Sequence, residues 1–278
     1  MPVLFDDRQG RYRIPGTYFL PPTNFTAEEA LAVTVLCYEL GGNDRLPFYR
    51  AALSAALKLE SSLPGALREQ VRQTTGGVEI RLQPLNPLEG QQSIYQQLLH
   101  AIAQSRAVRI RYDSFAEAVE IQTKLSPYRV LFSRHSWYVI GRSSLHREVR
   151  TFNVGRIGAL ELLDEQFQVP RRFSIERYLG NAWHLIPEPG GDEEVVIRFR
   201  KKVARNVAEV HWHKTQRLEM RADGTLDFHI TVSGLNEISW WILGYGDQAE
   251  VLKPDRLRDM IAQHAARMVK AYHGKHDS

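Results

Sequence analysis

The sequence predicts an α+β protein with an N-terminal helical segment, a small and strongly bent β-barrel, and a C-terminal βαββαβ module. Three observations predict this class: helical spacing of apolar residues up to residue 104, a run of short alternating strands between 106 and 163, and a second alternation of strands and helices after residue 194. A chain of 278 residues is long enough to bury two or three separate cores.

The first 22 residues predict a turn-rich arm, in which FDDRQGRYRI alternates like a hairpin with Gln9-Gly10 as its turn. Thr26 and Glu29 then form a capping box that opens a helix, and Gly41-Gly42 closes it. Apolar residues fall on nearly every face of this helix, so we expect it to be well buried. Three further helices are expected at about 47–59, 65–73 and 91–104, with a Gly- and Pro-rich connector at 74–90.

Short strands dominate the next segment. Val108, Ile110 and Tyr112 alternate with polar residues, which is typical of a strand with one buried face. Further strands are expected near 119–124, 128–132, 137–142, 149–154 and 158–163. One helix followed by five or six short strands predicts a small, strongly bent barrel.

Residues 166–193 predict an interdomain tether with one short helix after Ser174, and Pro and Gly residues at 187–191 mark a boundary. Beyond it we expect strand 195–200, helix 202–209, strand 216–221, a tight turn at Asp223-Gly224, strand 226–232, helix 236–243, strand 249–252 and helix 255–272. This order is a split βαβ arrangement with one extra helix.

Charge is distributed unevenly along the chain. Residues 106–156 hold ten Lys/Arg and four Asp/Glu, residues 157–197 hold three and eight, and residues 198–221 hold eight and two. Two basic segments separated by an acidic one predict two positive surfaces that face one anionic ligand. The alternative is that these charges are solvated on all sides.

Cys37 is the only cysteine, which excludes an intrachain disulfide and a thiolate metal cluster and fits a reducing cytoplasm. Its apolar surroundings predict a small core residue and not a nucleophile. We expect no signal peptide, because Met1 leads into a polar segment, and no apolar run approaches the roughly 20 residues that cross a bilayer.

The most informative stretch contains Trp137-Tyr138 on one apolar run and Arg150, Phe152 and Arg156 on the next. If the second run is extended, side chains two apart share a face, and an aromatic ring lies between two cations. That combination suits a phosphate-bearing ligand that can stack, such as single-stranded nucleic acid. The alternative is that the aromatic residues are barrel core and both arginines are ordinary surface charges.

These residues resemble the WYL-domain family of bacterial transcriptional regulators. The positions that carry the resemblance are Pro127-Tyr128, Trp137-Tyr138-Val139, Arg150, Phe152 and Arg156-Ile157. The resemblance implies a residual wing or arm at 1–22, a helical linker at 23–90, a WYL domain with an Sm/SH3-like barrel at 91–165, a tether at 166–193 and a ferredoxin-like WCX extension at 194–278. It also implies an effector-sensing homodimer in the cytoplasm, associated with the nucleoid when it regulates.

For this family the effector implied is single-stranded nucleic acid, in the first place single-stranded DNA produced by DNA damage. Such regulators usually begin with a winged helix-turn-helix, of which only a hairpin-like remnant is visible here. We therefore expect promoter DNA to be bound through a domain that these residues lack. The expected effector-binding residues are Tyr128, Arg134, Tyr138, Arg142, Arg150, Arg156, Arg198, Arg200, Lys201, Lys202 and Arg205.

Each group has a different expected task. The guanidinium groups hold phosphate oxygens in bidentate contacts, and Tyr138 stacks or donates a hydrogen bond. Trp137 and Phe152 are expected as core support. Lys201, Lys202 and Arg205 crowd the start of a helix, where the helix dipole disfavours cations, so an anion between them is expected; a solvated basic face is the alternative.

We expect neither an enzyme nor a cofactor, because there is no Gly-rich phosphate loop with Lys-Ser/Thr and no GxSxG elbow. His211 and His213 could share a strand face as metal ligands. Two histidines at this spacing more often lie on an exposed strand edge, so we expect no metal. Two other interpretations of the function remain possible. The ligand could be a nucleotide or another phosphorylated small molecule, or the chain could be a protein-interaction module in which Trp240-Trp241 docks a partner.

Overall fold

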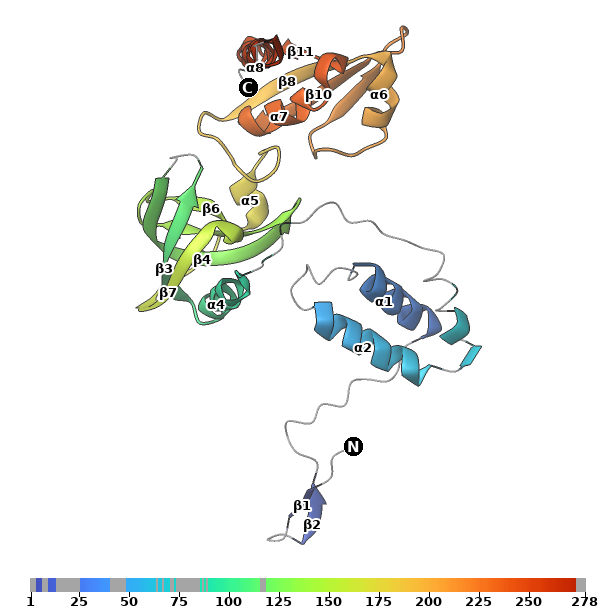
Figure 1. The fold of residues 1–278 in the computed structure, drawn as a ribbon, viewed down its shortest axis with the longest axis vertical. Coiled ribbons are helices and arrows are strands. Elements are labelled where there is room, and N and C mark those ends of the chain that lie inside the picture. The colour runs from blue at the N-terminus through green and yellow to red at the C-terminus, as the bar shows by residue number, and fades with distance from the viewer. Residues whose placement is uncertain are drawn as a thin grey trace. The chain divides into compact units, whose positions relative to one another are not determined.

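The computed structural model of the chain describes residues 4–6, 10–13, 26–40, 49–63, 65–66, 68–70, 73, 86, 88, 90–115 and 119–273. The chain forms two compact units, Met1–Ser93 with Phe132–Trp137, and Ile94–Leu131 with Tyr138–Ser278 (Figure 1). Among the described residues, no helix has both the length and the apolar composition needed to span a membrane.

The first unit contains the expected hairpin and two packed helices. Strand β1 (Leu4–Asp6) pairs with β2 (Arg11–Arg13), and Gly10 takes a positive φ of 59° between them. Helix α1 (Ala27–Leu40) opens with the expected capping box: the Thr26 N–H donates to Glu29 Oε2 at 2.8 Å, and the Glu29 N–H donates to Thr26 Oγ1 at 3.2 Å. The reciprocal bonds satisfy two N–H groups at the helix start.

Helix α2 (Tyr49–Ser62) packs against α1, and residues 65–66, 68–70 and 73 are helical where a third helix is expected. The expectation that α1 is well buried is wrong. Ala30 and Thr34 are buried, but Val33 and Leu36 are exposed, because α2, the helix that packs against α1 within the described part of the chain, covers only one side of it. The expected end of α1 at Gly41-Gly42 and most of the connector at 74–90 lie outside the described residues.

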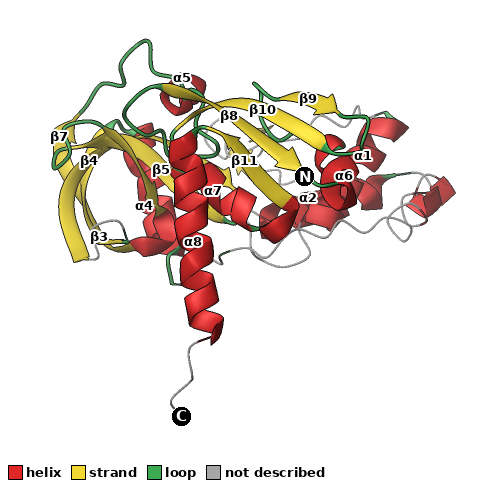
Figure 2. Cartoon of the chain, turned by 90° about the horizontal axis from the view of Figure 1, so that it is seen from above, coloured by secondary structure: helices red, strands yellow, loops and turns green. Residues whose placement is uncertain are grey.

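Most of helix α4 (Gln92–Ala103) lies in the second unit, together with most of a five-stranded sheet in the order β6-β5-β4-β3-β7. The strands are β3 (Arg106–Ser114), β4 (Val119–Ser133), β5 (Ser136–Ser143), β6 (Val149–Asn153) and β7 (Ile157–Gln166). Val108, Ile110 and Tyr112 are buried as predicted, and Leu98 of α4 is fully buried. Alternation along β3 therefore places the core on the inner face of a curled sheet (Figure 2).

Two expectations about this sheet need correction. The segments 119–124 and 128–132 form one strand, β4, which runs through Pro127. A Cβ at Gly141 of β5 would lie 2.3 Å from the Ser126 carbonyl oxygen, so only glycine fits where the two strands pass each other. The barrel is also not closed. A short 3₁₀ turn, η1 (Val154–Arg156), leads from β6 to β7, which pairs with β3, and no ladder joins β6 to β7 in the described sheet.

The tether contains the expected short helix, α5 (Ile175–Leu179), with Ser174 as its N-cap. The Arg177 N–H donates to Ser174 Oγ at 3.1 Å.

The C-terminal module has the predicted order of elements almost residue for residue. They are β8 (Asp192–Phe199), α6 (Lys201–Ala208), β9 (Arg217–Met220), β10 (Leu226–Ser233), α7 (Asn236–Leu243), β11 (Ala249–Lys253) and α8 (Asp255–His273). The antiparallel sheet order β11-β8-β10-β9 is ferredoxin-like. Its core joins the inner face of this sheet to α6 and α7. Trp241 packs against this core, whereas Trp240 is exposed.

Candidate functional site

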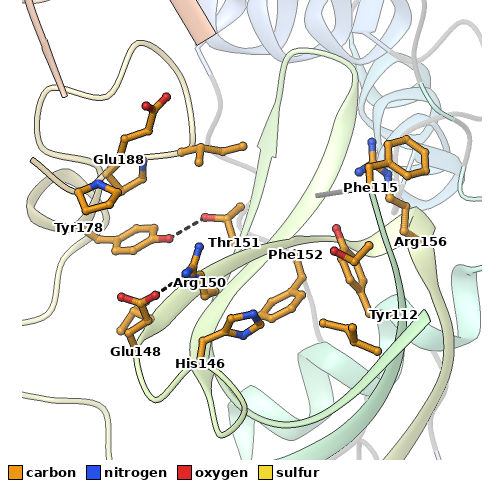
Figure 3. Close-up of a pocket in the computed structure, with 16 residues that line it drawn as sticks. Tyr112, Phe115, His146, Glu148, Arg150, Thr151, Phe152, Arg156, Tyr178 and Glu188 are labelled. Carbon is orange, nitrogen blue, oxygen red and sulfur yellow. Dashed lines mark hydrogen bonds and ion pairs between the residues drawn. The ribbon is translucent and has the colours of Figure 1, made fainter. Parts of the chain in front are cut away.

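A cavity of about 650 Å³ lies beside the edge strand β6. Its walls come from the ends of β3 and β4, the β5–β6 loop, β6 itself, η1 and the tether. Figure 3 shows the side chains that define it, which are Tyr112, Phe115, His146, Glu148, Arg150, Thr151, Phe152, Arg156, Tyr178 and Glu188. A cavity of this volume falls in the range of small-ligand sites.

Arg150 is an exposed residue of β6 that points toward the cavity and holds an ion pair with Glu148 (Figure 3). The distance from Arg150 Nη2 to Glu148 Oε1 is 2.5 Å, and both side chains are about half exposed. Ion pairs between solvated side chains contribute little free energy. A ligand with a stronger anionic group can therefore replace Glu148 as the partner of Arg150.

Arg156 reaches the same cavity from η1 and not from the strand. Strand β6 ends at Asn153, whose side-chain Oδ1 accepts a hydrogen bond from the Gly155 N–H at 2.9 Å and caps the turn. The expected alternation from Arg150 to Arg156 along one extended strand is therefore wrong, although both arginines do line one cavity. The Arg156 guanidinium carbon lies 3.6 Å from the centroid of the Phe115 ring, in cation–π geometry.

Phe152 and Tyr112 form the floor between these two arginines (Figure 3). Their rings meet edge to face with centroids 5.0 Å apart, and both side chains are buried. The Tyr112 hydroxyl accepts a hydrogen bond from the Asn153 N–H at 3.3 Å, at the point where β6 gives way to η1. Phe152 is therefore core support, as predicted.

The tether supplies the opposite wall. Thr151 Oγ1 donates to the Leu185 carbonyl at 3.3 Å, and it lies 3.1 Å from the Tyr178 hydroxyl. Because the single Thr151 proton points at Leu185, Tyr178 acts as the donor in the second bond. Burial raises the pKa of Tyr178, which keeps this hydroxyl protonated.

The same stretch of tether is fastened to the start of α7. The Glu237 carboxylate accepts hydrogen bonds from the backbone N–H groups of His184, Leu185 and Ile186 at 2.9 to 3.3 Å. The Glu188 carboxylate accepts from the Asn236 N–H at 2.9 Å. Charge-assisted bonds of this kind are stronger than neutral ones, so the wall of the cavity is held firmly to the C-terminal module.

A buried chain of hydroxyl groups orients His146 at the cavity rim. His146 Nδ1 lies 2.9 Å from Ser143 Oγ, which lies 2.9 Å from Thr123 Oγ1. Ser143 and Thr123 are both buried. The imidazole is thereby positioned from behind while one edge faces the cavity.

The structure does not bring the other predicted barrel residues to this cavity. Tyr128 is buried against Phe167 and Phe173, and burial raises its pKa. Tyr138 and Arg142 lie on β5 outside the lining, and Arg134 lies in the β4–β5 turn with a positive φ of 53°. Of the six predicted residues of this sheet, only Arg150 and Arg156 line the cavity.

In the C-terminal module, Arg198 is held by an internal carboxylate. Its Nε and Nη2 donate to the two oxygens of Asp227 at 2.7 and 2.8 Å, and Arg221 Nη1 donates to the same carboxylate at 3.0 Å. Hydrogen bonding with Arg198, and then with Arg221, lowers the pKa of Asp227. These contacts occupy the Arg198 fork, which is how a structural arginine is bound.

The remaining basic residues of this module lie at the start of α6. Arg200 is the N-cap residue of α6 and not part of β8, so it does not share a strand face with Arg198. Lys201, Lys202 and Arg205 are exposed on α6. The pKa of Asp247 is lowered by its hydrogen bond with Gln248 and further by the charges of Arg200 and Lys202.

His213 is also in structural surroundings: it stacks on Trp183 with ring centroids 5.9 Å apart, and its Nδ1 lies 2.9 Å from Thr215 Oγ1. Desolvation by burial lowers the pKa of His213. Within the described part of the chain, no group of three or more His, Cys, Asp or Glu side chains is arranged to hold a metal ion.

Sequence comparison identifies two known domains in this chain. A WYL domain model matches residues 93–162 and a WCX domain model matches residues 191–269, together more than half of the chain. The chain therefore belongs to the WYL-domain family of transcriptional regulators and carries the WCX extension.

The chain is also similar to three individual proteins. The chain is 26% identical over 258 residues to Protein PafB of Mycobacterium leprae (strain TN). The aligned region covers 90% of this chain and 73% of PafB. Among solved structures, it is similar to proteasome accessory factor B/C (PafBC) of Arthrobacter aurescens, with 19% identity, a TM-score of 0.32, and coverage of 91% of this chain and 37% of that one. It is also similar to a CRISPR Cas-related protein, with 12% identity, a TM-score of 0.49, and coverage of 91% and 75%.

Proposed function

We propose that this chain is the effector-sensing region of a WYL-family transcriptional regulator, and that the cavity beside β6 binds single-stranded nucleic acid, in the first place single-stranded DNA. One observation carries the proposal: Arg150, Arg156 and the aromatic ring of Phe115 line one cavity. Guanidinium groups bind phosphate oxygens through paired hydrogen bonds, and aromatic rings bind bases by stacking.

The charge balance of the cavity sets the expected strength of binding. Arg150 and Arg156 are accompanied by Glu148 and Glu188, so the lining is not strongly positive. A phosphate must displace Glu148 from Arg150 before it makes its own contacts. We therefore expect moderate affinity with a salt dependence that corresponds to about two neutralised phosphates.

The other parts of the proposal concern the complete regulator. Promoter DNA is bound by a winged helix-turn-helix outside these residues, and the protein acts as a cytoplasmic homodimer in the response to DNA damage. Occupation of the cavity changes promoter binding through the tether, which contacts both β6 and α7.

The proposal is tested by fluorescence anisotropy of the full chain with a labelled ten-nucleotide single strand. Wild-type affinity should fall about sevenfold between 50 and 200 mM salt, since two released counterions per single strand give a slope near −1.4. Arg150→Ala should weaken binding about tenfold or more and reduce that slope by about half.

Arg267→Ala is the charge-matched control, because Arg267 is an exposed residue of α8 that does not line the cavity. Undetectable binding, or equal affinity of wild type and Arg150→Ala, contradicts the proposal.

A phosphorylated small molecule is the second candidate, favoured by the cavity volume of about 650 Å³ and by the tether that closes one side. Mononucleotides and cyclic dinucleotides should therefore be titrated as competitors. Tighter binding of either one than of the single strand would favour this candidate.

A further inference from the structure

We propose that Phe115 is a stacking platform that binds one unpaired nucleobase of the effector. This inference rests on the proposed function and adds a base-binding subsite to the phosphate contacts of Arg150. Phe115 directly follows the last residue of β3 and is absent from the residues that the sequence pattern predicts.

The exposure of Phe115 is the first observation. Its side chain is 69% exposed, and it is the only phenylalanine among the exposed large apolar residues of the described chain. Single exposed apolar residues are common and need no explanation by themselves. Phe115 differs from such a residue because it lines a cavity and is held by a cation.

The position of the ring is fixed from one side. The Arg156 guanidinium carbon lies 3.6 Å from the ring centroid, while most of the ring surface stays open to solvent. Figure 3 shows Phe115 and Arg156 stacked at the cavity, on the far side of Tyr112 from Arg150. A second flat group can thus continue the stack that begins with the guanidinium.

Arg156 is itself held by rigid backbone. It is the last residue of η1, the turn capped by Asn153, and the nearby residues Val154 and Ile157 are completely buried. Because Arg156 is anchored by these core residues, the Phe115 ring needs little further ordering when a ligand arrives. A preorganised site loses less entropy on binding.

The chemistry of the cavity favours a ligand with both a base and a phosphate. Glu148 and Glu188 oppose a ligand that is only a chain of phosphates. A nucleobase is neutral and flat, and every base offers a π face. Stacking on Phe115 therefore adds affinity for an unpaired strand over a sugar–phosphate backbone without bases, and it does so with no preference for base sequence. In a duplex the bases are paired and stacked, and the platform has no base to receive.

The test measures anisotropy of the full chain with two labelled single strands of ten units, a thymidine oligonucleotide and an abasic oligonucleotide with the same number of phosphates. Phe115→Ala and Phe115→Leu should both weaken the thymidine strand about five- to one-hundredfold, and Phe115→Trp should keep wild-type affinity. None of the three should change affinity for the abasic strand. Phe115→Leu keeps an apolar side chain, so it separates stacking from simple apolar contact.

Two failures are distinguishable. If Arg150→Ala weakens both strands but Phe115→Ala changes neither, or changes both equally, the base platform is wrong and the proposed function stands. If neither strand binds the wild-type chain, the proposed function fails as well. Thermal unfolding of each variant confirms that the exposed substitutions leave the fold intact.

Discussion

Arg150 beside the β6 cavity and Arg198 in the C-terminal sheet each hold a carboxylate, but the two carboxylates lie in different surroundings. Glu148, the partner of Arg150, is 56% exposed, whereas Asp227, the partner of Arg198, is 7% exposed and is also bound by Arg221. A buried carboxylate cannot be left without its partners, but an exposed one can be replaced by a ligand at little cost. The burial of the counter-ion, and not the number of cations, separates a structural arginine from one that can bind a ligand.

The largest expected effect follows from breaking the buried pair. Asp227→Asn removes the charge that Arg198 and Arg221 share, and we expect it to lower the free energy of unfolding by about 2–3 kcal/mol. Urea denaturation measures this change. Glu148→Gln is the matched control, with an expected loss below about 0.5 kcal/mol. Equal losses in the two variants would remove the distinction between the two sites.

The same pair predicts a dependence of stability on pH. Hydrogen bonds from Arg198 and Arg221 hold the pKa of Asp227 below its usual value, so this carboxylate stabilises the fold above the unfolded pKa of about 3.9. Its contribution is lost as the pH falls through the folded pKa. We therefore expect the stability difference between wild type and Asp227→Asn to be constant from about pH 7 to 5 and to shrink below about pH 4. Denaturation at several pH values checks this, and a difference that persists unchanged at pH 3.5 would contradict it.

The smallest expected effect concerns the exposed pair. Glu148→Gln removes an internal anion that competes with phosphate for Arg150, so affinity for a single strand should rise about two- to fivefold. Glu165→Gln is the control, because Glu165 pairs with Lys124 at 2.8 Å and does not line the cavity. Weaker binding by Glu148→Gln would mean that Glu148 helps to hold the ligand.

Local signals in the sequence predicted much of the fold. The capping box at Thr26 and Glu29 forms both of its hydrogen bonds, and the turn at Asp223-Gly224 places Gly224 at a positive φ of 84°. The C-terminal module followed from the same kinds of signal, because each element there is bounded by a turn and has a clear period. The sequence predicts two strands, at 119–124 and 128–132, whereas the structure has one strand, β4, that runs through Pro127 and passes close to Gly141.

The candidate site was less predictable because its parts meet only in three dimensions. Arg150 and Arg156 were expected to face the same ligand from one strand. They do line one cavity, but Arg156 lies in the capped turn η1 and not on β6. Phe115 and Tyr178 approach the cavity from distant segments, and no local pattern distinguishes them from ordinary residues. Arg198 of β8 looked available for a ligand because its partner Asp227 lies 29 residues further along the chain, on the neighbouring strand β10. Strand register cannot be deduced from charge alone.

Leu185 has a further consequence, because its backbone serves two parts of the molecule at once. Its carbonyl accepts from Thr151 of β6, and its N–H donates to Glu237 at the start of α7. The side chain is buried, so the residue cannot swing aside to relieve a pull from either direction. Leu185 therefore couples β6 mechanically to α7. A shift of Thr151 must either break one of these two hydrogen bonds or move the first turn of α7 with it.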